Sequence, residues 1–304
     1  MDIVLLLFRQ NIIMILYMLI GVFLYKKNLV TEKGSGEFGK LLVYIVMPAV
    51  ILKAYIVEFS TDILLGLGIS MLAAAVCLLL SILVSRIVFK NDPIEHFGCA
   101  FSNAGFIGIP LVQAVLGTEA VFYVSSFVAF LNILQWTYGV YIMTGDKTTI
   151  SAKKIATNPV VLAFVVGIIL FFLPIQLPEI FTTVIGSVAG MNAPLAMIIL
   201  GIYLAQLPLR EILKGKQVYL ATLVRLIVIP LITFGVLSLL PMEFRIIKLT
   251  ALIAAAAPVG SNVAIFAQMN NKDYTQAVKD VCLSTLLCII TLPLIVGLAN
   301  ILWS

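Results

Sequence analysis

CAFSNAGFIGIPLVQ, residues 99–113, is the stretch from which the architecture follows, because it places polar and helix-breaking residues inside a long apolar run. Pro110 has no amide hydrogen and its ring clashes with the preceding turn, so a helix here must break or kink. A second stretch of this kind, AAAAPVGSNVAIFAQ, occupies residues 254–268 and contains Pro258. Interrupted segments at corresponding places in two halves of a membrane protein are typical of a solute-binding site.

The composition is that of a membrane protein. Of the 304 residues, 62% are hydrophobic and 11% are charged, and the mean hydropathy is +1.17. A soluble domain carries roughly 25% charged residues, so most of this surface is expected to face lipid. The net charge of +5 comes mainly from Lys and Arg at the ends of apolar runs. This pattern indicates orientation in the bilayer, and we expect no nucleic acid partner.

Ten apolar runs predict ten membrane helices. A polar linker, residues 144–158, separates the fifth run from the sixth. The sequence therefore predicts an all-α membrane protein with one five-helix unit over residues 1–143 and another over residues 159–304. The runs cover residues 3–25, 38–57, 63–89, 97–116, 121–143, 159–173, 180–207, 218–240, 246–269 and 274–302.

The basic residues predict the orientation. The even-numbered connections carry mainly acidic residues, whereas 14 of the 19 Lys and Arg residues lie in the odd-numbered ones. The positive-inside rule places the odd-numbered connections in the cytoplasm and both termini outside it, in a multi-pass protein of the cell membrane. The basic residues concerned are Lys26, Lys27, Lys33, Lys40, Arg86, Lys90, Lys147, Lys153, Lys154, Arg210, Lys214, Lys216, Lys272 and Lys279.

Five spans per half predict that the second half enters the membrane from the opposite side, as an inverted repeat. Pro48 and Pro194 lie in the second spans of the two halves, and Pro110 and Pro258 lie in the fourth spans. The separation between the members of the two pairs is nearly the same. The proline positions therefore agree with the repeat that the topology predicts.

The polar residues around the two interruptions are the candidate substrate-binding residues. Freed backbone groups in a membrane must face protein or a water-filled cavity. The half-helix N-termini that follow carry a partial positive charge suited to an anion. Alternatively, Pro and Gly here serve only to kink and pack the helices. The candidates are Ser102, Asn103, Gly108, Pro110, Gln113, Pro258, Gly260, Ser261, Asn262 and Arg225.

Charged residues inside apolar runs are candidates for function. Arg225 lies about a third of the way into the eighth run, where a role inside the bundle and snorkelling to the interface both stay open. For Arg9 and Lys53, nearer the ends of their runs, snorkelling is favoured. No Asp or Glu is expected well inside a span, since Asp280 is placed at a helix end, and this favours transport without a coupled cation. His96 is expected at the membrane interface.

Sequence signatures of enzymes and metal sites are missing. The chain has no G-x-S-x-G, H-E-x-x-H or P-loop motif. Its four cysteines form no C-x-x-C pair. We therefore predict no enzyme, no cofactor and no metal site.

With these residues in view, the chain resembles the auxin efflux carrier family, which includes plant PIN carriers and microbial organic-acid permeases. The resemblance rests on MPAVIL at residues 47–52, SNAGFIGIPL at residues 102–111 and APVGSNVAIFA at residues 257–267, together with length and ten-span layout. Plant members often carry a long central hydrophilic loop, which is short here. The resemblance therefore implies the microbial branch, whose substrates are small carboxylates such as malate or malonate.

The resemblance also implies a fold and a mechanism. The fold consists of two inverted five-helix repeats, similar to NhaA and the bile-acid transporters, with broken fourth and ninth helices that cross at Pro110 and Pro258. Helices one, two, six and seven form a scaffold, and helices three to five and eight to ten form a transport unit. A small organic anion binds near Asn103 and Asn262 and is exported by an elevator-type motion. Homodimerisation occurs through the scaffold.

Two other functions stay open. A sodium-coupled organic-anion symporter of the bile-acid type has a similar architecture, and sodium dependence of uptake would distinguish it. A membrane sensor would bind a ligand on the same fold without moving it. It would show ligand binding without counterflow.

Overall fold

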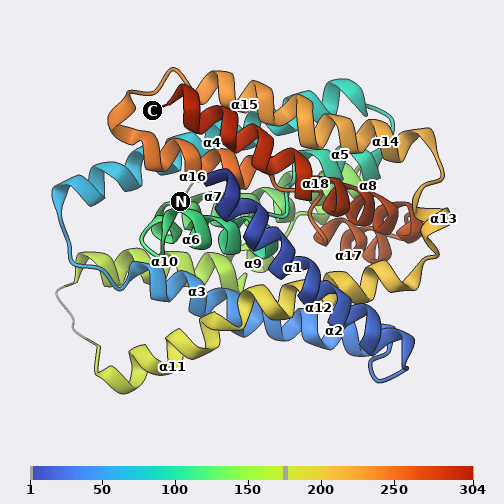
Figure 1. Cartoon of the computed structure of the whole chain (residues 1–304), viewed down its shortest axis with the longest axis horizontal. Helices are drawn as coiled ribbons and strands as arrows, with labels where there is room; N and C mark the ends of the chain where they lie inside the picture. Colours follow the sequence, from blue (N-terminus) through green and yellow to red (C-terminus); the bar gives the residue numbers. More distant parts are fainter. Residues whose placement is uncertain (1–2, 174–176, 304) are drawn as a thin grey trace.

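The computed structural model describes residues 3–173 and 177–303, and regular structure in these residues is helical apart from one isolated β-bridge (Figure 1). Within them, seven segments are long and apolar enough to cross a membrane. Two shorter apolar segments are Ala104–Leu116 and Pro159–Phe172. The prediction of an all-α multi-pass membrane protein is confirmed. The seven segments are Ile3–Lys26, Lys33–Tyr55, Thr61–Val88, Ala120–Thr144, Glu179–Gln206, Lys216–Leu237 and Tyr274–Leu302.

The α-helices are joined by short loops, and the described residues also include four π-helical turns (η1, η2, η3 and η5) and two 3₁₀ turns (η4 and η6). The elements are α1 (Ile3–Lys26), α2 (Glu32–Leu41), η1 (Leu42–Val46), α3 (Met47–Tyr55), α4 (Thr61–Val88), α5 (Pro93–Ala100), η2 (Ala104–Gly108), α6 (Ile109–Leu116), α7 (Ala120–Leu134), η3 (Gln135–Gly139), α8 (Val140–Thr144), η4 (Lys147–Thr149), α9 (Ala152–Ala156), α10 (Pro159–Phe172), α11 (Glu179–Gly190), α12 (Asn192–Gln206), α13 (Leu209–Ile212), α14 (Lys216–Leu223), η5 (Val224–Val228), α15 (Ile229–Leu237), η6 (Met242–Phe244), α16 (Arg245–Ala256), α17 (Asn262–Met269) and α18 (Tyr274–Leu302).

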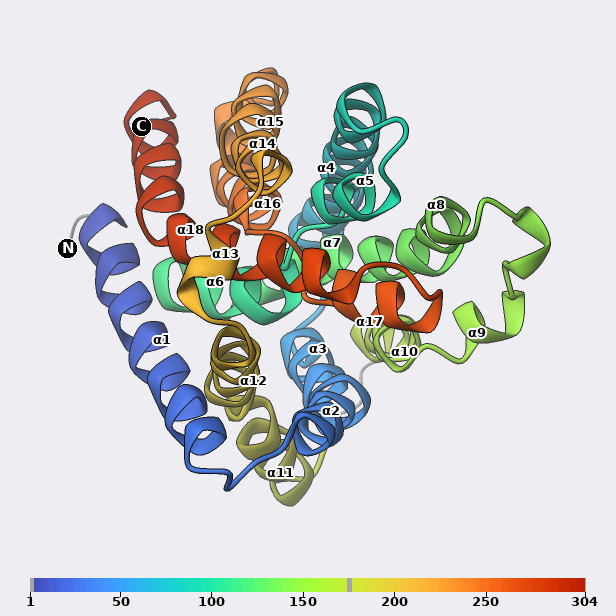
Figure 2. The same ribbon diagram turned by 90° about the vertical axis from the view of Figure 1, so that its right-hand side faces the viewer.

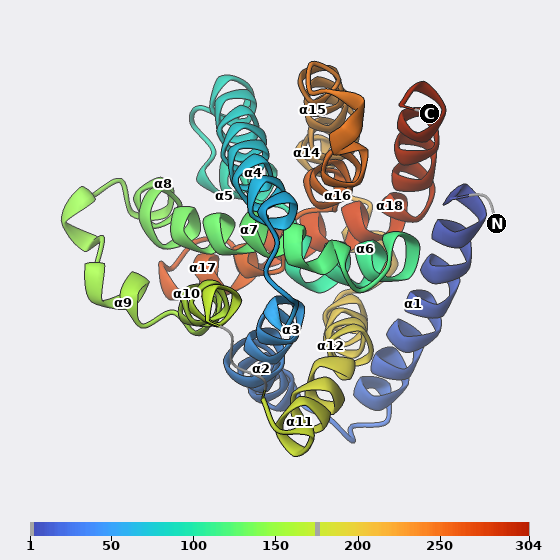
Figure 3. The ribbon, with the colours of Figure 1, turned by 90° about the vertical axis from the view of Figure 1, so that its left-hand side faces the viewer.

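The helices form two groups, and α6 and α17 run across the space between them (Figure 2 and Figure 3). In one group α1 packs along α12, and α3 packs against α10 and α11. The other group contains α4, α5, α14, α15, α16 and α18. Gly21 and Gly201 let α1 and α12 touch, because an added Cβ would overlap the carbonyl of Ile198 or Met18. Small residues at such contacts allow membrane helices to approach closely.

A proline follows three of the π-helical turns within two residues. η1, η2 and η5 each end two residues before one, at Pro48, Pro110 and Pro230 respectively. Proline lacks an N–H group and its ring displaces the carbonyl four residues earlier, so the preceding turn widens. In η2 the Ile109 amide consequently donates to the carbonyl of Ala104, five residues back. These prolines widen one turn of their helices, and the helices continue past them.

Two main-chain interruptions meet near the middle of the molecule. One separates α5 from η2, and the other separates α16 from α17. They pair as a short antiparallel bridge between Ser102 and Val259. The Asn103 amide donates to the Pro258 carbonyl at 2.8 Å. Each interruption thus supplies partners for the backbone groups of the other, which a membrane interior requires.

The prediction that the fourth run breaks at Pro110 is wrong. The interruption lies eight residues earlier, at Ser102. Pro110 lies inside one continuous helical segment, Ala104–Leu116, and the widened turn η2 before it accommodates the missing amide and the ring. Pro258, by contrast, lies inside the second interruption.

The crossing divides the two broken segments unequally. α5 and α17, which adjoin the loops that carry Lys90 and Lys272, have 8 residues each. On the other side of the crossing, α16 has 12 residues, and η2 and α6 have 5 and 8. The crossing therefore lies nearer to the basic end of the molecule.

Three ionisable side chains lie deeper than predicted. α5 begins at Pro93 instead of Phe97, so Glu95 and His96 belong to the helix and are buried. Asp280 is buried within α18. The expectation that the spans hold no buried carboxylate is therefore wrong, and His96, which was expected at the membrane interface, packs among protein atoms in the first turn of α5.

Candidate functional site

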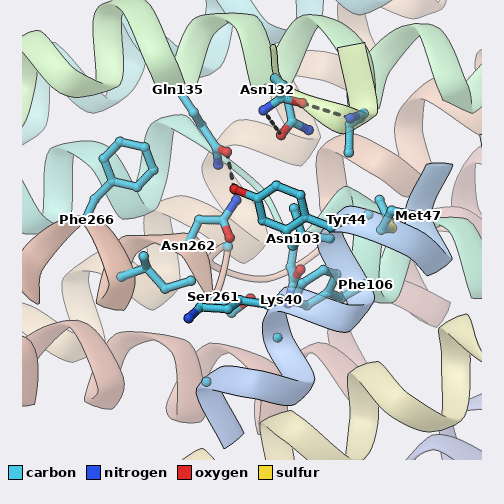
Figure 4. A pocket seen from close by; sticks show the side chains of 18 of the residues that line it. Lys40, Tyr44, Met47, Asn103, Phe106, Asn132, Gln135, Ser261, Asn262 and Phe266 are labelled. Carbon is cyan, nitrogen blue, oxygen red and sulfur yellow. Dashed lines mark hydrogen bonds between the residues drawn. The ribbon is translucent and has the colours of Figure 1, made fainter. Parts of the chain in front are cut away.

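A cavity of about 1030 Å³ lies beside the crossing (Figure 4). One wall is formed by both interruptions, by α17, and by α7 with η3. The facing wall comes from α2, η1 and the start of α10. Exposed residues before and within α2 and around α9 form its rim, so the cavity reaches from the crossing to the basic end of the molecule.

The charged residues of the lining are all of one sign. Lys33 and Lys40 on α2 and Lys154 on α9 line the cavity, and its described lining includes no Asp or Glu. All three lysines are exposed at the rim. Lys154 Nζ lies 5.7 Å from the centroid of the Trp136 ring, a cation–π contact that holds it over the cavity wall. A cleft lined by positive charge concentrates anions.

Three buried side-chain groups at the inner end have no hydrogen-bond partner in the described chain: Ser102 Oγ, Asn103 Nδ2 and Gln135 Nε2. Their residues are 3%, 5% and 1% exposed. All three groups can donate a hydrogen bond, and leaving such a group unsatisfied costs about 1–3 kcal/mol. A ligand or water that accepts hydrogen bonds would satisfy them.

Turn η3 positions Gln135. Unlike the other π-helical turns, η3 is not followed by a proline, so no proline explains its widened geometry. Gln135 Oε1 accepts a hydrogen bond from Asn262 Nδ2 at 2.8 Å, which orients the amide group and leaves Nε2 available (Figure 4). π-helical turns are frequent at functional sites.

The start of α17 adds positive potential to the cavity. The helix begins at Asn262, and no side chain caps its first amides. Asn262 and Ser261 both line the cavity. The Val263 and Ala264 amides donate to the carbonyls of Gly260 and Ser261 at 3.0 and 3.2 Å. The N-terminal end of the helix dipole is directed toward the cavity wall, as predicted for the segment after Pro258.

The structure brings five of the ten predicted site residues to the cavity, and Gln268 also lies in its wall. Gln113 points away on an exposed face of α6. The five that line the cavity are Ser102, Asn103, Gly260, Ser261 and Asn262. The five that do not are Gly108, Pro110, Gln113, Pro258 and Arg225.

Arg225 lies behind the crossing and is 1% exposed. Its Nε donates to the Ala257 carbonyl at 3.0 Å, and its Nη1 donates to the Cys99 carbonyl at 2.8 Å. These carbonyls belong to the C-terminal ends of α16 and α5, where the helix dipole is negative. Arg225 therefore stabilises both interruptions at once. Arg9 and Lys53 are exposed, in agreement with snorkelling.

Sequence reasoning missed several residues of the cavity. Gln135 lies in an apolar run without a nearby helix breaker, and its polarity alone was the available signal. In the sequence, Lys40 and Lys154 indicate only the orientation of the chain in the membrane. Asn158 lines the cavity and its Oδ1 caps the start of α10, accepting from the Val160 amide at 2.9 Å. The pattern Asn-Pro at residues 158–159 is a helix-start signal that predicts this cap.

Comparison with known proteins gives the family. The sequence matches the Mem_trans family, described as "Membrane transport protein", over residues 6–296. The chain belongs to this membrane transport protein family. The resemblance to auxin efflux carriers, which are part of it, is thereby confirmed. The chain is a membrane transporter, and nothing in the match points to an enzyme.

Two relatives of this membrane transport protein are each 25% identical to it. One, from Rhizobium meliloti (strain 1021), is named "Putative malonate transporter" and aligns over 274 residues, 85% of each chain. The other, from Methanothermobacter thermautotrophicus, is named "Uncharacterized transporter". It aligns over 292 residues, 91% of this chain and 93% of the relative.

Proposed function

We propose that this transporter carries a small organic anion, a carboxylate such as malonate, which binds in the cavity beside the crossing. The observation that carries the proposal is the lining, whose described residues include three lysines and no carboxylate and surround buried donors that lack partners in the described chain. Such a surface attracts negative charge and can satisfy carboxylate oxygens. The relative named as a malonate transporter supports the choice of malonate.

The rim of the cavity attracts the anion, and the inner end of the cavity binds it. Lys33, Lys40 and Lys154 attract the anion from water, and this steering weakens with salt. At the inner end, Asn103 and Gln135 donate to the carboxylate oxygens. Each hydrogen bond to a charged group contributes about 1.5–3 kcal/mol. The dipole of α17 adds to the attraction.

The two helix groups support an elevator-type mechanism. We assign α1, α2, α3, α10, α11 and α12 to a scaffold, and α4 to α8 with α14 to α18 to a transport unit, as two inverted repeats over residues 1–143 and 159–304. The cavity lies between these units, so that displacement of the crossing along the scaffold would carry the anion across, with export as the physiological direction. α11 has no buried residue, which suits a homodimer contact through the scaffold.

Malonate tests the proposal. It should raise the unfolding temperature of the purified protein, because a ligand that binds only the folded state stabilises it. Labelled malonate should exchange across proteoliposomes in counterflow. Asn103→Ala and Asn262→Ala should each weaken malonate binding about 10- to 100-fold, since each removes or misaligns a donor to a charged group.

Gln113→Ala is the matched control, because Gln113 is an exposed amide outside the cavity. It should bind malonate as the wild type does. Wild-type affinity in both asparagine variants would exclude the crossing as the site. Binding that depends on sodium would favour the bile-acid type of symporter, and binding without counterflow would favour a sensor.

Cysteine labelling tests the proposed orientation. The native cysteines Cys77, Cys99, Cys282 and Cys288 are buried, so they leave a low background. In intact cells, an impermeant thiol reagent should label a cysteine placed at Glu119 and not one placed at Thr149, because the basic loops are proposed to be cytoplasmic. The reverse pattern would contradict the orientation and the location of both termini outside the cytoplasm.

A further inference from the structure

Glu95 on α5 and Asp280 on α18 lie on either side of one amide group. Gln276 Nε2 donates to Glu95 Oε1 at 2.9 Å and to Asp280 Oδ1 at 3.3 Å. The two carboxyl groups are 0% and 1% exposed. Their second oxygens, Glu95 Oε2 and Asp280 Oδ2, are buried and have no hydrogen-bond partner in the described chain.

In the described residues, no basic side chain forms an ion pair with Glu95 or Asp280. The two ion pairs found in the described residues join Lys214 and Lys279 to Glu211, so the basic residue adjacent to Asp280 is directed elsewhere. Arg225 donates through Nε and Nη1 to two carbonyls and forms no ion pair with either acid in the described residues. Two ionised carboxylates this close, without a counter-charge, would repel each other strongly. Asp92 lies beside Glu95, and its negative charge acts on both acids and adds to the repulsion. The other titratable or charged groups on the elements packed around the pair are Arg9, Tyr17, Tyr25, Lys26, Asp62, Cys77, Arg86, His96, Cys99, Tyr138, Tyr141, Tyr203, Arg210, Lys216, Tyr219, Arg245, Lys248, Asp273, Tyr274, Cys282 and Cys288.

The geometry favours a proton over a metal ion. The amide hydrogens of Gln276 fill the position between the carboxyl groups where a cation would have to bind. A bound cation needs oxygen atoms directed toward it, whereas here a donor is directed at both acids. A proton on Oε2 or Oδ2 removes the repulsion and needs no additional space.

The pair is linked to the crossing through both of its helices. α5 leads from Glu95 directly into the first interruption. On α18, the Ser284 hydroxyl donates to the Asp280 carbonyl at 2.6 Å and accepts from the Val259 amide in the second interruption at 3.1 Å. Each helix that carries one acid of the pair thus also contacts one of the two interruptions.

We propose that Glu95 and Asp280 form a proton-binding site in the transport unit and that the proton accompanies the anion, an inference that rests on the proposed function. A carboxylate of the pair takes the proton from water on one side of the membrane, and an O–H bond forms at Oε2 or Oδ2. The bond breaks and the proton returns to water after the crossing has moved. The proton offsets one negative charge of the transported carboxylate.

Thermal unfolding between pH 5 and pH 9, without malonate, tests the proton site itself. The folded state holds the proton more tightly than the unfolded chain, so stability should fall as the pH rises. We expect the unfolding temperature of the wild type to drop by at least about 5 °C. The variant Glu95→Gln/Asp280→Asn mimics the protonated pair and should lose that drop.

Glu243→Gln, which changes an exposed acid far from the pair, should keep the wild-type pH dependence. His96 is present in all three proteins, so the comparison is made between chains that share this titratable group. An equal drop in the double variant would overturn the proton site. So would a stabilisation by sodium relative to potassium that the double variant lacks, because it would identify a metal ion as the occupant.

Malonate movement at zero membrane potential tests the coupling. In wild-type proteoliposomes with a pH-sensitive dye inside, an inward malonate gradient should acidify the lumen. The double variant should take up malonate with an acidification per malonate at least tenfold smaller. Net uptake of malonate without acidification in the wild type would overturn the coupling. Absence of exchange in both proteins would refute the proposed function for malonate, while the unfolding experiment still decides the proton site.

Discussion

Arg225→Met should lower the unfolding temperature by about 10 °C, the largest effect that we expect from a single change of side-chain chemistry. The substitution removes two charged hydrogen bonds, to the carbonyls of Cys99 and Ala257. Each contributes about 1.5–3 kcal/mol, and the stranded carbonyls would remain buried, so the loss should be about 3–6 kcal/mol. Thermal unfolding of the purified protein in detergent measures it.

Arg225→Lys should fall between the wild type and Arg225→Met. An ammonium group keeps the charge but cannot reproduce the planar fork that reaches two carbonyls. Arg9→Met is the control, because Arg9 is exposed near the end of α1. If Arg225→Met unfolds within 2 °C of the wild type, Arg225 does not hold the two interruptions together.

Gly260→Ala should destabilise the protein by about 3 kcal/mol or more and abolish malonate binding. A Cβ on Gly260 would lie 2.9 Å from the Phe101 carbonyl oxygen and 3.1 Å from that of Ser102. Both contacts are to backbone, so the interruptions would have to separate. Overpacking of this kind costs about 1–3 kcal/mol, and the bond from the Gly260 amide to the Phe101 carbonyl, 3.0 Å long, would be lost as well.

Gly68→Ala provides the comparison for this substitution. Gly68 lies in α4, and an added Cβ there meets nothing within 4 Å. Since alanine is the better helix former, Gly68→Ala should leave stability unchanged or slightly improved. The unfolding temperatures of the two variants should be measured with and without malonate. A loss confined to Gly260→Ala would show that the close approach at the crossing, and not the added methyl group in general, causes the effect.

The sequence predicted that two interrupted segments would come together, because Pro, Gly and Asn in an apolar run have few other uses. It did not locate the first interruption. A proline marks a disturbance of the helix, yet Pro110 is accommodated by the widened turn η2 inside the continuous segment Ala104–Leu116. The pairing of Ser102 with Val259, which joins residues far apart in the chain, determines where the break falls.

The site was predicted in part for a related reason. Ser102, Asn103, Ser261 and Asn262 are next to the interruptions and come to the cavity with them. The position of Arg225 in a span does not reveal which way its side chain points. In the structure the side chain donates to two backbone carbonyls behind the cavity. Residues contributed by neighbouring spans depend on packing between helices, which a single sequence does not encode locally.

The unequal division of the broken segments has an electrical consequence. Water in the cavity conducts, so on its side of the crossing the membrane potential changes little between the basic end and the inner donors. Most of the voltage must then fall across the longer halves, η2 with α6 and α16, which close the other side. Loading of an anion from the basic end would consequently be almost insensitive to voltage. The step that carries the loaded crossing past the scaffold would respond to the membrane potential.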